Sequence, residues 1–356
     1  MRSRLAPILV LVAVTTACGT DDNSARLARG RTPRAAVVGA NDRATLSGAG
    51  ATFPATLVQE WIKEYRPLAP GVTLNYQPIG SGAGIQQLTS RTVDFAGSDV
   101  PLTASEVAAT GGPGAVVQVP WTAGGVAVEY NLPGVEDLRL TPSTLAGIFA
   151  GRITRWNDPA VRADNPGMQL PAAGIQVVRR SDGSGTTQVF TDYLTAAAPD
   201  VWTFPSGKDW PAGTPGTGAK GSDGVTAAVK QAVGAIGYAE PSYPKQAGLG
   251  IARIRNPAGN FVHPEAAPVS AALAEAAANA DGTLSPNYTP VGRDAYPISS
   301  ASYLMFYRSI DDPAKETALK NFAAWAITEG QDLAEGLDYA PLPEPVQVRA
   351  LGAVKL

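Results

Sequence analysis

Three short segments combine glycine with serine or threonine in a way that suits the binding of an oxyanion. They are Gly50-Ala51-Thr52-Phe53, Gly80-Ser81-Gly82 and Asp182-Gly183-Ser184-Gly185-Thr186, each between a predicted strand and a predicted helix. A helix N-terminus presents unpaired backbone N–H groups and about half a positive charge. Glycine lets the backbone approach a ligand, and hydroxyl groups add further donors. One such turn would be an ordinary helix cap, but three in one chain predict an anion site.

The same segments lack the motifs of nucleotide binding and of hydrolysis. Lys220 has neither the glycine before it nor the serine or threonine after it that the Walker pattern requires. Phe53 and Ile85 stand where the dinucleotide pattern Gly-x-Gly-x-x-Gly needs its last glycine. Asp182 stands where the nucleophile elbow Gly-x-Ser-x-Gly needs its first glycine. The turns therefore predict anion binding without nucleotide or ester chemistry.

Two residue types that often do chemistry occur only once each, as Cys18 and His263. A single cysteine excludes an internal disulfide, a thiolate zinc site and an iron–sulfur cluster within one chain. A single histidine leaves little material for a histidine-based metal site or a catalytic triad. The formal net charge of -3 argues against a nucleic-acid partner. We therefore expect no enzyme activity, no cofactor and no metal.

Residues 1–17 have the pattern of an export signal and not of a folded element. A basic start precedes a mostly apolar run over residues 5–17, which is too short to span a membrane. The run ends at Cys18, which resembles the lipid anchor of a bacterial lipoprotein, although Thr15 departs from the aliphatic residue that this signal prefers. An ordinary cleaved signal is the alternative. Residues 18–44 are predicted to form a flexible tether, so we expect an extracytoplasmic protein, lipid-anchored at the outer face of the cell membrane or periplasmic.

The rest of the chain alternates between strand and helix patterns. Residues 72–76 alternate like a strand, and the apolar residues of 57–65 recur at helical spacing. Thr141, followed by proline, predicts a helix start, and Ser222 or Asp223 is predicted to cap a later helix. The length of 356 residues favours two domains. The alternation predicts an α/β fold with largely parallel sheets.

At this point a resemblance to a known family becomes specific. The chain resembles the substrate-binding lipoprotein of the bacterial high-affinity phosphate ABC importer. The resemblance covers about residue 46 to the C-terminus, and the run around Arg180 is its most specific part. The segments that carry it are Gly48–Pro54, Val93–Asp99, Arg155–Asp158, Val178–Thr186, Gly234–Tyr238 and Leu337–Pro343.

The resemblance implies a two-lobed periplasmic-binding-protein fold of type II, in which each lobe is a mixed sheet flanked by helices. Lobe one would comprise residues 45–120 plus 297–356, and lobe two residues 121–296. The chain would cross between lobes near 119–125 and 293–299. The implied partners are inorganic phosphate and the permease of an ABC importer with its cytoplasmic ATPase.

The resemblance also implies which residues bind phosphate in the cleft between the lobes. Hydroxyl groups, backbone N–H groups and one guanidinium would donate, and one carboxylate would accept. Independently of the resemblance, Asp182 stands two residues after Arg180 and is expected to hold that guanidinium in place, with a turn residue before Gly183 as the alternative. The family often has a second serine where this chain has Gly82. The implied phosphate-binding residues are Thr52, Phe53, Ser81, Asp99, Arg180, Ser184, Gly185 and Thr186.

The predicted donors and the single acceptor suit phosphate on chemical grounds. Phosphate at neutral pH carries at least one proton, and sulfate carries none. Asp99 would accept that proton in a hydrogen bond, whereas facing sulfate it would meet a lone pair. Arg180 can bond two oxygens of one phosphate. Taken alone, Asp99 would better suit a helix cap after a strand.

Two other functions remain open from the sequence. A binder of another oxyanion, such as arsenate, a phosphonate or sulfate, would use the same turns, and arsenate would satisfy the Asp99 argument as well as phosphate does. A secreted phosphatase is less favoured, because the chain offers one histidine and no evident metal cluster.

Overall fold

The computed structural model describes residues 39–355. The predicted export signal, Cys18 and nearly all of the predicted tether lie outside the described residues. Within residues 39–355, no helix is both long and apolar enough to cross a membrane.

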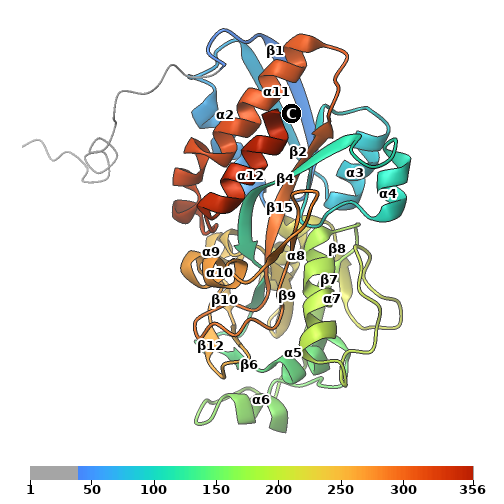
Figure 1. The fold of residues 1–356 in the computed structure, drawn as a ribbon. Helices are drawn as coiled ribbons and strands as arrows, with labels where there is room; N and C mark the ends of the chain where they lie inside the picture. The colour runs from blue at the N-terminus through green and yellow to red at the C-terminus, as the bar shows by residue number, and fades with distance from the viewer. Residues whose placement is uncertain (1–38, 356) are drawn as a thin grey trace, which may run out of the picture. The chain divides into compact units, whose positions relative to one another are not determined.

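The first of two five-stranded sheets draws its strands from both ends of the described chain (Figure 1). β1 lies parallel to β2 and β3, whereas β15 lies antiparallel to β3 and β4, so the sheet is mixed. Buried and exposed residues alternate along most of β2, as predicted for residues 72–76. In sheet order the strands are β2 (Val72–Pro78), β1 (Ala44–Gly50), β3 (Phe95–Ser98), β15 (Ser299–Tyr307) and β4 (Val116–Gly125).

The second sheet is built from the middle of the chain. β7 lies parallel to β8 and β9, whereas β5 lies antiparallel to β9 and β10. The predicted α/β fold is therefore confirmed, with both sheets mixed and not largely parallel. In sheet order the strands are β10 (Gly250–Ile251), β5 (Ala127–Tyr130), β9 (Ala235–Ala239), β7 (Gln176–Arg180) and β8 (Thr217–Ala219).

Helices pack on both sheets. Helices α2 (Ala55–Tyr65), α3 (Ser81–Thr89), α11 (Pro313–Ile327) and α12 (Glu344–Lys355) contact the first sheet, and the short α4 (Ala104–Ala109) contacts α3. In the second half, α8 (Gly221–Gln231) packs on the sheet and α5 (Pro142–Phe149) packs on α7 (Gly185–Ala197). The other elements there are α6 (Pro159–Asp164), α9 (Ser242–Ala247) and a small sheet of β6 (Arg139–Leu140), β11 (Arg253–Arg255) and β12 (Phe261–Val262).

The chain ends with short helical turns before α12. The 3-10 helices η1 (Glu329–Leu333) and η2 (Glu335–Leu337) follow α11. The buried side chain of Gln331 donates to the carbonyl of Trp121 at 2.9 Å and accepts from the N–H of Leu342 at 2.9 Å. These bonds fasten the C-terminal segment to β4.

Of the two helix starts predicted above, one is confirmed and the other is not. Thr141 accepts a hydrogen bond from the N–H of Thr144 and precedes Pro142, as expected of an N-cap. The prediction for α8 was wrong, because this helix begins at Gly221 and not after Ser222 or Asp223. Its cap position is Lys220, whose side chain makes no capping bond.

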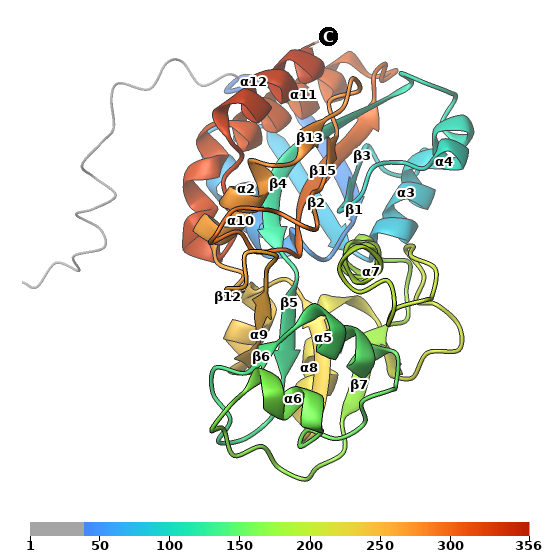
Figure 2. The same ribbon diagram turned by 60° about the horizontal axis from the view of Figure 1, so that its bottom comes forward.

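Two of the connections between the two sheets lie next to each other. The first crossing joins β4 to β5 at Val126, and the second enters β15 after Ile298. The N–H of Val126 donates to the carbonyl of Ile298 at 2.8 Å, so the two connecting segments lie side by side. Figure 2 shows β4 continuing into β5 between the two sheets.

One segment departs from the predicted lobe boundary. Helix α10 (Ala266–Leu273) contacts β4 and β15 of the first sheet. The hairpin of β13 (Ala277–Ala278) and β14 (Leu284–Ser285) follows, and the Leu284 N–H donates to the Tyr303 hydroxyl at 3.0 Å. The sequence prediction had placed residues 121–296 together in lobe two, but this segment packs on the first sheet.

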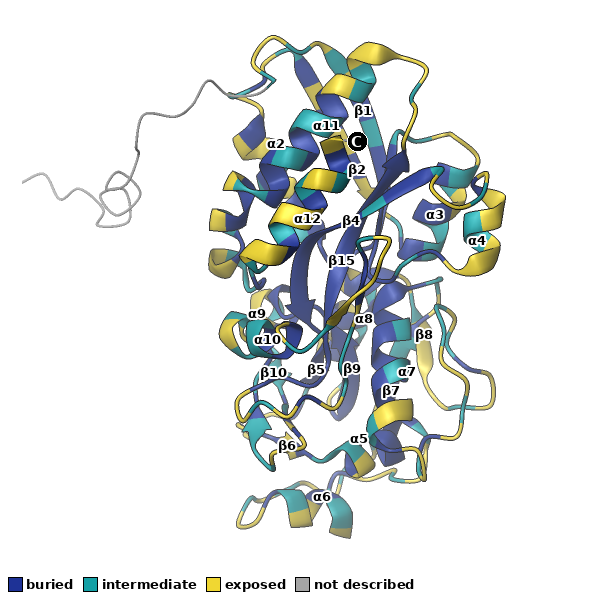
Figure 3. Cartoon of the chain, in the orientation of Figure 1, coloured by how far each residue is buried: buried dark blue, intermediate teal, exposed yellow. Residues whose placement is uncertain are grey.

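The core is made of buried strands and large aromatic side chains. Figure 3 shows both sheets as largely buried and α4 and α6 as largely exposed or intermediate. Trp61 is fully buried, donates to the Gly330 carbonyl at 2.7 Å, and lies edge-on to Trp121 with ring centroids 5.6 Å apart. Trp156, Trp202 and Trp325 are buried too.

Gly50 lies too close to β3 and to the turn before α3 to carry a side chain. Its φ is +146°, and a Cβ there would lie 2.1 Å from the Gly97 carbonyl oxygen. Its own carbonyl accepts from the N–H groups of Ile79 and Gly80 at 2.9 and 2.8 Å. A side chain at this position would therefore push β1 and β3 apart and displace the turn before α3.

We predict that Gly50→Ala lowers the free energy of unfolding by about 3 kcal/mol, because it adds both a clash and an unfavourable φ. Urea unfolding monitored by tryptophan fluorescence measures this. Gly207→Ala is the matched control, because a Cβ at Gly207 meets no atom within 4 Å. Equal midpoints for the two variants would contradict the prediction.

Candidate anion-binding site

The three glycine-containing turns meet between the two sheets. Thr52 and Phe53 follow β1, Ser81 opens α3 after β2, and Asp99 follows β3. Because these strands are parallel, their carboxyl ends share one edge of the sheet. Arg180, at the end of β7, and the first residues of α7 lie on the other side. All the predicted side chains of this anion-site cluster are at most 3% exposed: Thr52, Phe53, Ser81, Asp99, Arg180, Ser184 and Thr186.

Hydrogen bonds connect the turns of the two sheets directly. The N–H of Gly82 donates to the Gly183 carbonyl at 2.9 Å. The N–H of Gly185 donates to the Ser81 hydroxyl at 3.0 Å, and the Thr186 hydroxyl donates to Asp99 Oδ2 at 3.0 Å. A Cβ at Gly82 would lie 3.2 Å from the Gly183 backbone, so a serine there would crowd this contact. The departure from the family pattern at Gly82 is thus compatible with a close approach.

Arg180 is the buried cation of the site. Its Nε and Nη2 donate to the two oxygens of Asp182 at 2.7 and 2.5 Å, and Nη1 donates to the Thr52 hydroxyl at 3.2 Å. Burial alone would raise the pKa of Asp182, but the hydrogen bond and charge of Arg180 lower it below its ordinary value. The pair leaves the end of the guanidinium formed by Nη1 and Nη2 directed away from Asp182.

Asp99 is the acceptor of the site. Oδ1 accepts from the Ser302 hydroxyl and Oδ2 from the Thr186 hydroxyl, both at 3.0 Å. Burial raises the pKa of Asp99 to about 6, against the opposing effect of these hydroxyls and of Arg180. The carboxyl group is therefore a hydrogen-bond acceptor at neutral pH that sits close to its own titration.

Phe53 contributes backbone and not side-chain chemistry. Its ring packs edge-on against Tyr339 with centroids 6.2 Å apart, and its carbonyl accepts from the Tyr339 hydroxyl at 2.7 Å. Among the hydrogen bonds within residues 39–355, none is donated by the Phe53 N–H. Ser184 caps α7 by accepting from the Thr187 N–H at 3.1 Å, which leaves its own O–H to donate.

The sequence prediction missed Ser222, which lies beside Thr52 at the start of α8. The two hydroxyl oxygens are 2.9 Å apart, and the Ser222 N–H donates to the Thr52 hydroxyl at 3.2 Å. The preceding N–H, of Gly221, donates to Asp182 Oδ1 at 3.1 Å. Gly221-Ser222 follows β8 and opens a helix, which is the pattern of the other three turns, so the signal was present in the sequence.

Two further residues of the site carried no usable sequence signal. Ser302 reaches Asp99 from β15, more than 200 residues along the chain. The Tyr243 hydroxyl donates to the Thr52 carbonyl at 2.6 Å, and burial raises the pKa of Tyr243. Both contacts depend on the packing of distant elements.

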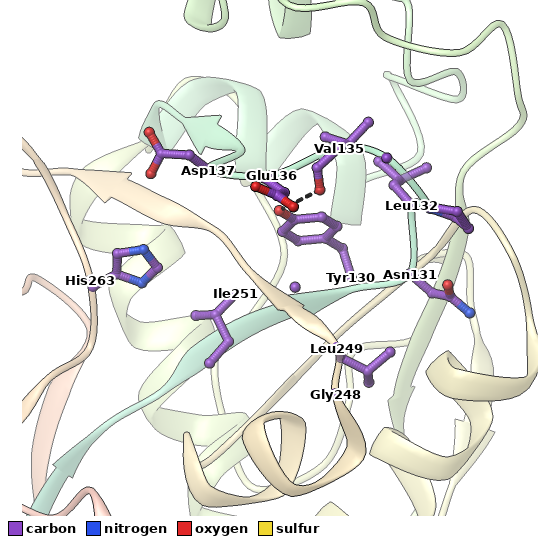
Figure 4. Close-up of a pocket in the computed structure, with 13 residues that line it drawn as sticks. Tyr130, Asn131, Leu132, Val135, Glu136, Asp137, Gly248, Leu249, Ile251 and His263 are labelled. Atoms are coloured by element: carbon purple, nitrogen blue, oxygen red, sulfur yellow. Dashed lines mark hydrogen bonds between the residues drawn. The ribbon is translucent and has the colours of Figure 1, made fainter.

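The single histidine lies away from this cluster. His263 borders a cavity of about 650 Å³ at the end of β5, together with the loop from Asn131 to Asp137 and residues 248–251 (Figure 4). None of the predicted anion-site residues lines this cavity. Burial, followed by the charge of Arg253, lowers the pKa of His263, so its imidazole is neutral at pH 7. His263 is half-buried and not on the fully exposed surface.

Comparison with known proteins agrees with this geometry. The family model of the PBP superfamily domain matches residues 35–329. The chain is 39% identical over 309 residues to the phosphate-binding protein PstS of Xylella fastidiosa (strain 9a5c), covering 84% of this chain and 81% of the relative. It is 36% identical over 352 residues to the phosphate-binding protein PstS3 of Mycobacterium bovis (strain BCG / Pasteur 1173P2), covering 96% and 94%.

Solved structures share the fold. A high affinity periplasmic phosphate-binding protein (PfluDING) bound with phosphate at pH 8.5 superposes with a TM-score of 0.70 at 26% identity, covering 86% of this chain and 92% of that chain. A phosphate-binding protein from Stenotrophomonas maltophilia superposes with the same TM-score of 0.70 at 21% identity, covering 87% and 93%. These likenesses confirm the predicted type II periplasmic-binding-protein fold, and with the sequence matches they establish that the chain belongs to the PBP superfamily and, within it, to the PstS phosphate-binding proteins.

Proposed function

We propose that this protein captures inorganic phosphate outside the cytoplasm and delivers it to the permease of an ABC importer. The observation that carries the proposal is the buried cluster in which many neutral donors and one arginine surround a single acceptor, Asp99. The names of the relatives, and a structural neighbour described as bound with phosphate, support the same ligand. The relatives are named as binding proteins, which supports a role without catalysis.

The residues proposed to bind phosphate contribute different kinds of donor. The hydroxyls of Thr52, Ser81, Ser184 and Thr186 would donate, as would the N–H groups of Phe53, Gly185 and Thr186. Gly185 and Ser81 now bond each other across the site. An oxyanion placed between them would accept from both, and the free end of Arg180 would bond two of its oxygens.

Asp99 would provide the discrimination between phosphate and sulfate. Its carboxylate would accept the proton of phosphate, whereas with sulfate it would face an unprotonated oxygen. Arsenate carries the same protons as phosphate, so this acceptor does not distinguish the two, and arsenate is the second candidate ligand. A phosphatase is disfavoured because the neutral His263 borders a different cavity.

The two crossing segments support closure of two lobes on the ligand. We propose that lobe one is built on the first sheet and includes α10 with the β13–β14 hairpin, and that lobe two is built on the second sheet. The paired segments at Val126 and Ile298 would form part of the hinge, because they join β4 to β5 and lead back to β15. The closed form would present the surface that the permease recognises.

We propose that Cys18 carries a lipid and keeps the protein at the outer face of the cell membrane. The sequence of residues 1–18 supports this, and Cys18 lies outside the described residues. An ordinary cleaved signal remains the alternative, since Thr15 departs from the preferred pattern. Metabolic labelling with a radioactive fatty acid tests the anchor, and a Cys18→Ala control should lose the label.

The proposed ligand is tested by isothermal titration calorimetry on protein freed of bound anion. We expect phosphate to bind at least about a thousandfold more tightly than sulfate, because an unmatched buried acceptor costs several kcal/mol. Tight sulfate binding would overturn the proposal. Arsenate titrated in the same way measures how far the site separates the two protonated anions.

Replacement of Asp99 by asparagine tests the selectivity. In Asp99→Asn the amide can donate to an unprotonated oxygen, so the preference for phosphate over sulfate should fall by about a hundredfold or more. The exposed Asp311→Asn removes the same charge elsewhere and should leave the preference unchanged. If the ratio of the two dissociation constants stays the same in Asp99→Asn, Asp99 has no part in the discrimination.

The same variant tests the state of Asp99 in the absence of ligand. A pKa of about 6 in the folded chain, above the ordinary 3.8, means that folding favours the protonated form. The stability from this group is fully present below pH 3.8 and declines as the pH rises through 6, by about 3 kcal/mol in all. Urea unfolding should therefore show the parent losing stability relative to Asp99→Asn between pH 4 and pH 7. A constant difference over this range would contradict the raised pKa.

A further inference from the structure

We propose that Lys208 is a positioning residue for the anion, and that its ion pair with Glu106 latches the two lobes closed. This inference rests on the proposed function. The Lys208 ammonium lies 2.5 Å from Glu106 Oε1. Glu106 belongs to α4, beside α3 of the first sheet, and Lys208 lies in the segment between α7 and β8. The pair therefore joins the two halves of the molecule outside the anion-site cluster.

The backbone of Lys208 belongs to the anion site itself. Its carbonyl accepts from the Ser184 N–H at 2.9 Å. Ser184 in turn caps α7, whose first residues Gly185 and Thr186 bond Ser81 and Asp99. A restraint on Lys208 is thus transmitted through one hydrogen bond to the turn that would hold the anion.

Hydrogen bonds from Thr103 hold the Glu106 side chain in position independently of Lys208. Its Oε2 accepts from the N–H and the hydroxyl of Thr103 at 2.8 and 2.9 Å, in a capping box at the start of α4. Burial works to raise the pKa of Glu106, but the bonds from Lys208 and Thr103 lower it overall. The carboxylate is therefore both charged and oriented at neutral pH, so little freedom is lost when the lobes close.

The burial of this pair distinguishes it from a second ion pair between the halves. The side chains of Lys208 and Glu106 are 14% and 23% exposed, so water and salt screen them only partly. Lys245 in α9 also lies 2.5 Å from Asp338, but those side chains are 46% and 31% exposed. Exposed pairs contribute little, so the Lys208–Glu106 pair is the better latch.

The ion pair would change the affinity by changing the fraction of the protein molecules that are closed. The apparent dissociation constant equals the intrinsic one divided by the fraction of binding-competent protein. Release needs the lobes to open and the ion pair to separate, so losing the pair should act mainly on the dissociation rate. We expect the loss to speed phosphate release about five- to tenfold.

The experiment measures phosphate release from the full mature chain by stopped-flow, with a fluorescent phosphate trap, and affinity by calorimetry. Glu106→Gln keeps the capping acceptor and removes the charge, and Lys208→Met keeps the backbone bond to Ser184. Each should speed release five- to tenfold with the association rate nearly unchanged. The double variant should be no faster than either single one, and Lys208→Arg should restore the parent rate.

Control measurements distinguish the effect of this ion pair on release from a general effect of charge and from a loss of stability. Glu316→Gln removes the same charge and breaks an ion pair with Lys320 inside α11, 2.8 Å long, so its release rate should stay within about twofold of the parent. Raising the salt concentration should speed release from the parent more than from Glu106→Gln. Thermal midpoints of the variants should match that of Glu316→Gln.

The outcomes that overturn the inference differ from those that overturn the proposed function. If the parent binds phosphate and both single variants release it at the parent rate, the latch is wrong and the proposed function stands. Additive effects in the double variant would also overturn the pairing. If the parent does not bind phosphate, the proposed function falls and the latch falls with it.

Discussion

A buried guanidinium needs a compensating charge, and the pairing of Arg180 with Asp182 meets this constraint. Arg180 is 2% exposed and gives two of its nitrogens to the Asp182 carboxylate. Asp182 also accepts from the Gly221 N–H, and the third guanidinium nitrogen reaches Thr52 of the opposite sheet. The starts of α8 and α2 and the end of β7 are therefore all oriented by one ion pair. Without Asp182 the site would hold an unpaired buried charge, which costs several kcal/mol.

Because that pair is neutral as a whole, the site offers dipoles more than charge. The donors of the three turns are backbone N–H groups and hydroxyls at the starts of helices, and they keep their orientation without a bound ion. Asp99 adds an acceptor whose burial raises its pKa close to neutrality. An acidic chain can thus present a locally attractive surface to an anion.

Local patterns carried most of what the sequence predicted, and long-range packing explains what it missed. The turns at Gly50, Gly80 and Gly183 were recognisable because strand, glycine, hydroxyl and helix follow one another within a few residues. Gly221-Ser222 has the same pattern, but its strand has three residues and was hidden in a loop rich in glycine and proline. Ser302 and Tyr243 reach the site from elements far along the chain, and no spacing rule connects them to Asp99 or Thr52.

The placement of α10 shows a second limit of the same kind. Its sequence is mostly apolar but does not say which sheet will bury it, and the structure packs it on β4 and β15. The cap of α8 was mispredicted because a capping side chain was expected there, whereas the N–H of Gly221 is bonded by Asp182 from another element. In both cases a tertiary contact replaces the local interaction that sequence reasoning assumes.

The adjacency of Val126 and Ile298 has a consequence for how such a chain can change over evolution. A segment that leaves and re-enters at neighbouring points, joined here by a 2.8 Å hydrogen bond, is topologically an insertion into the remainder of the fold. Its two ends need no long linkers, so recombination could exchange this cassette between related genes without rethreading the strands of the first sheet, provided that its α10 still packs on β4 and β15. One half of the ligand shell would travel with the cassette and the other would stay behind, which allows new specificities to arise by recombining intact halves.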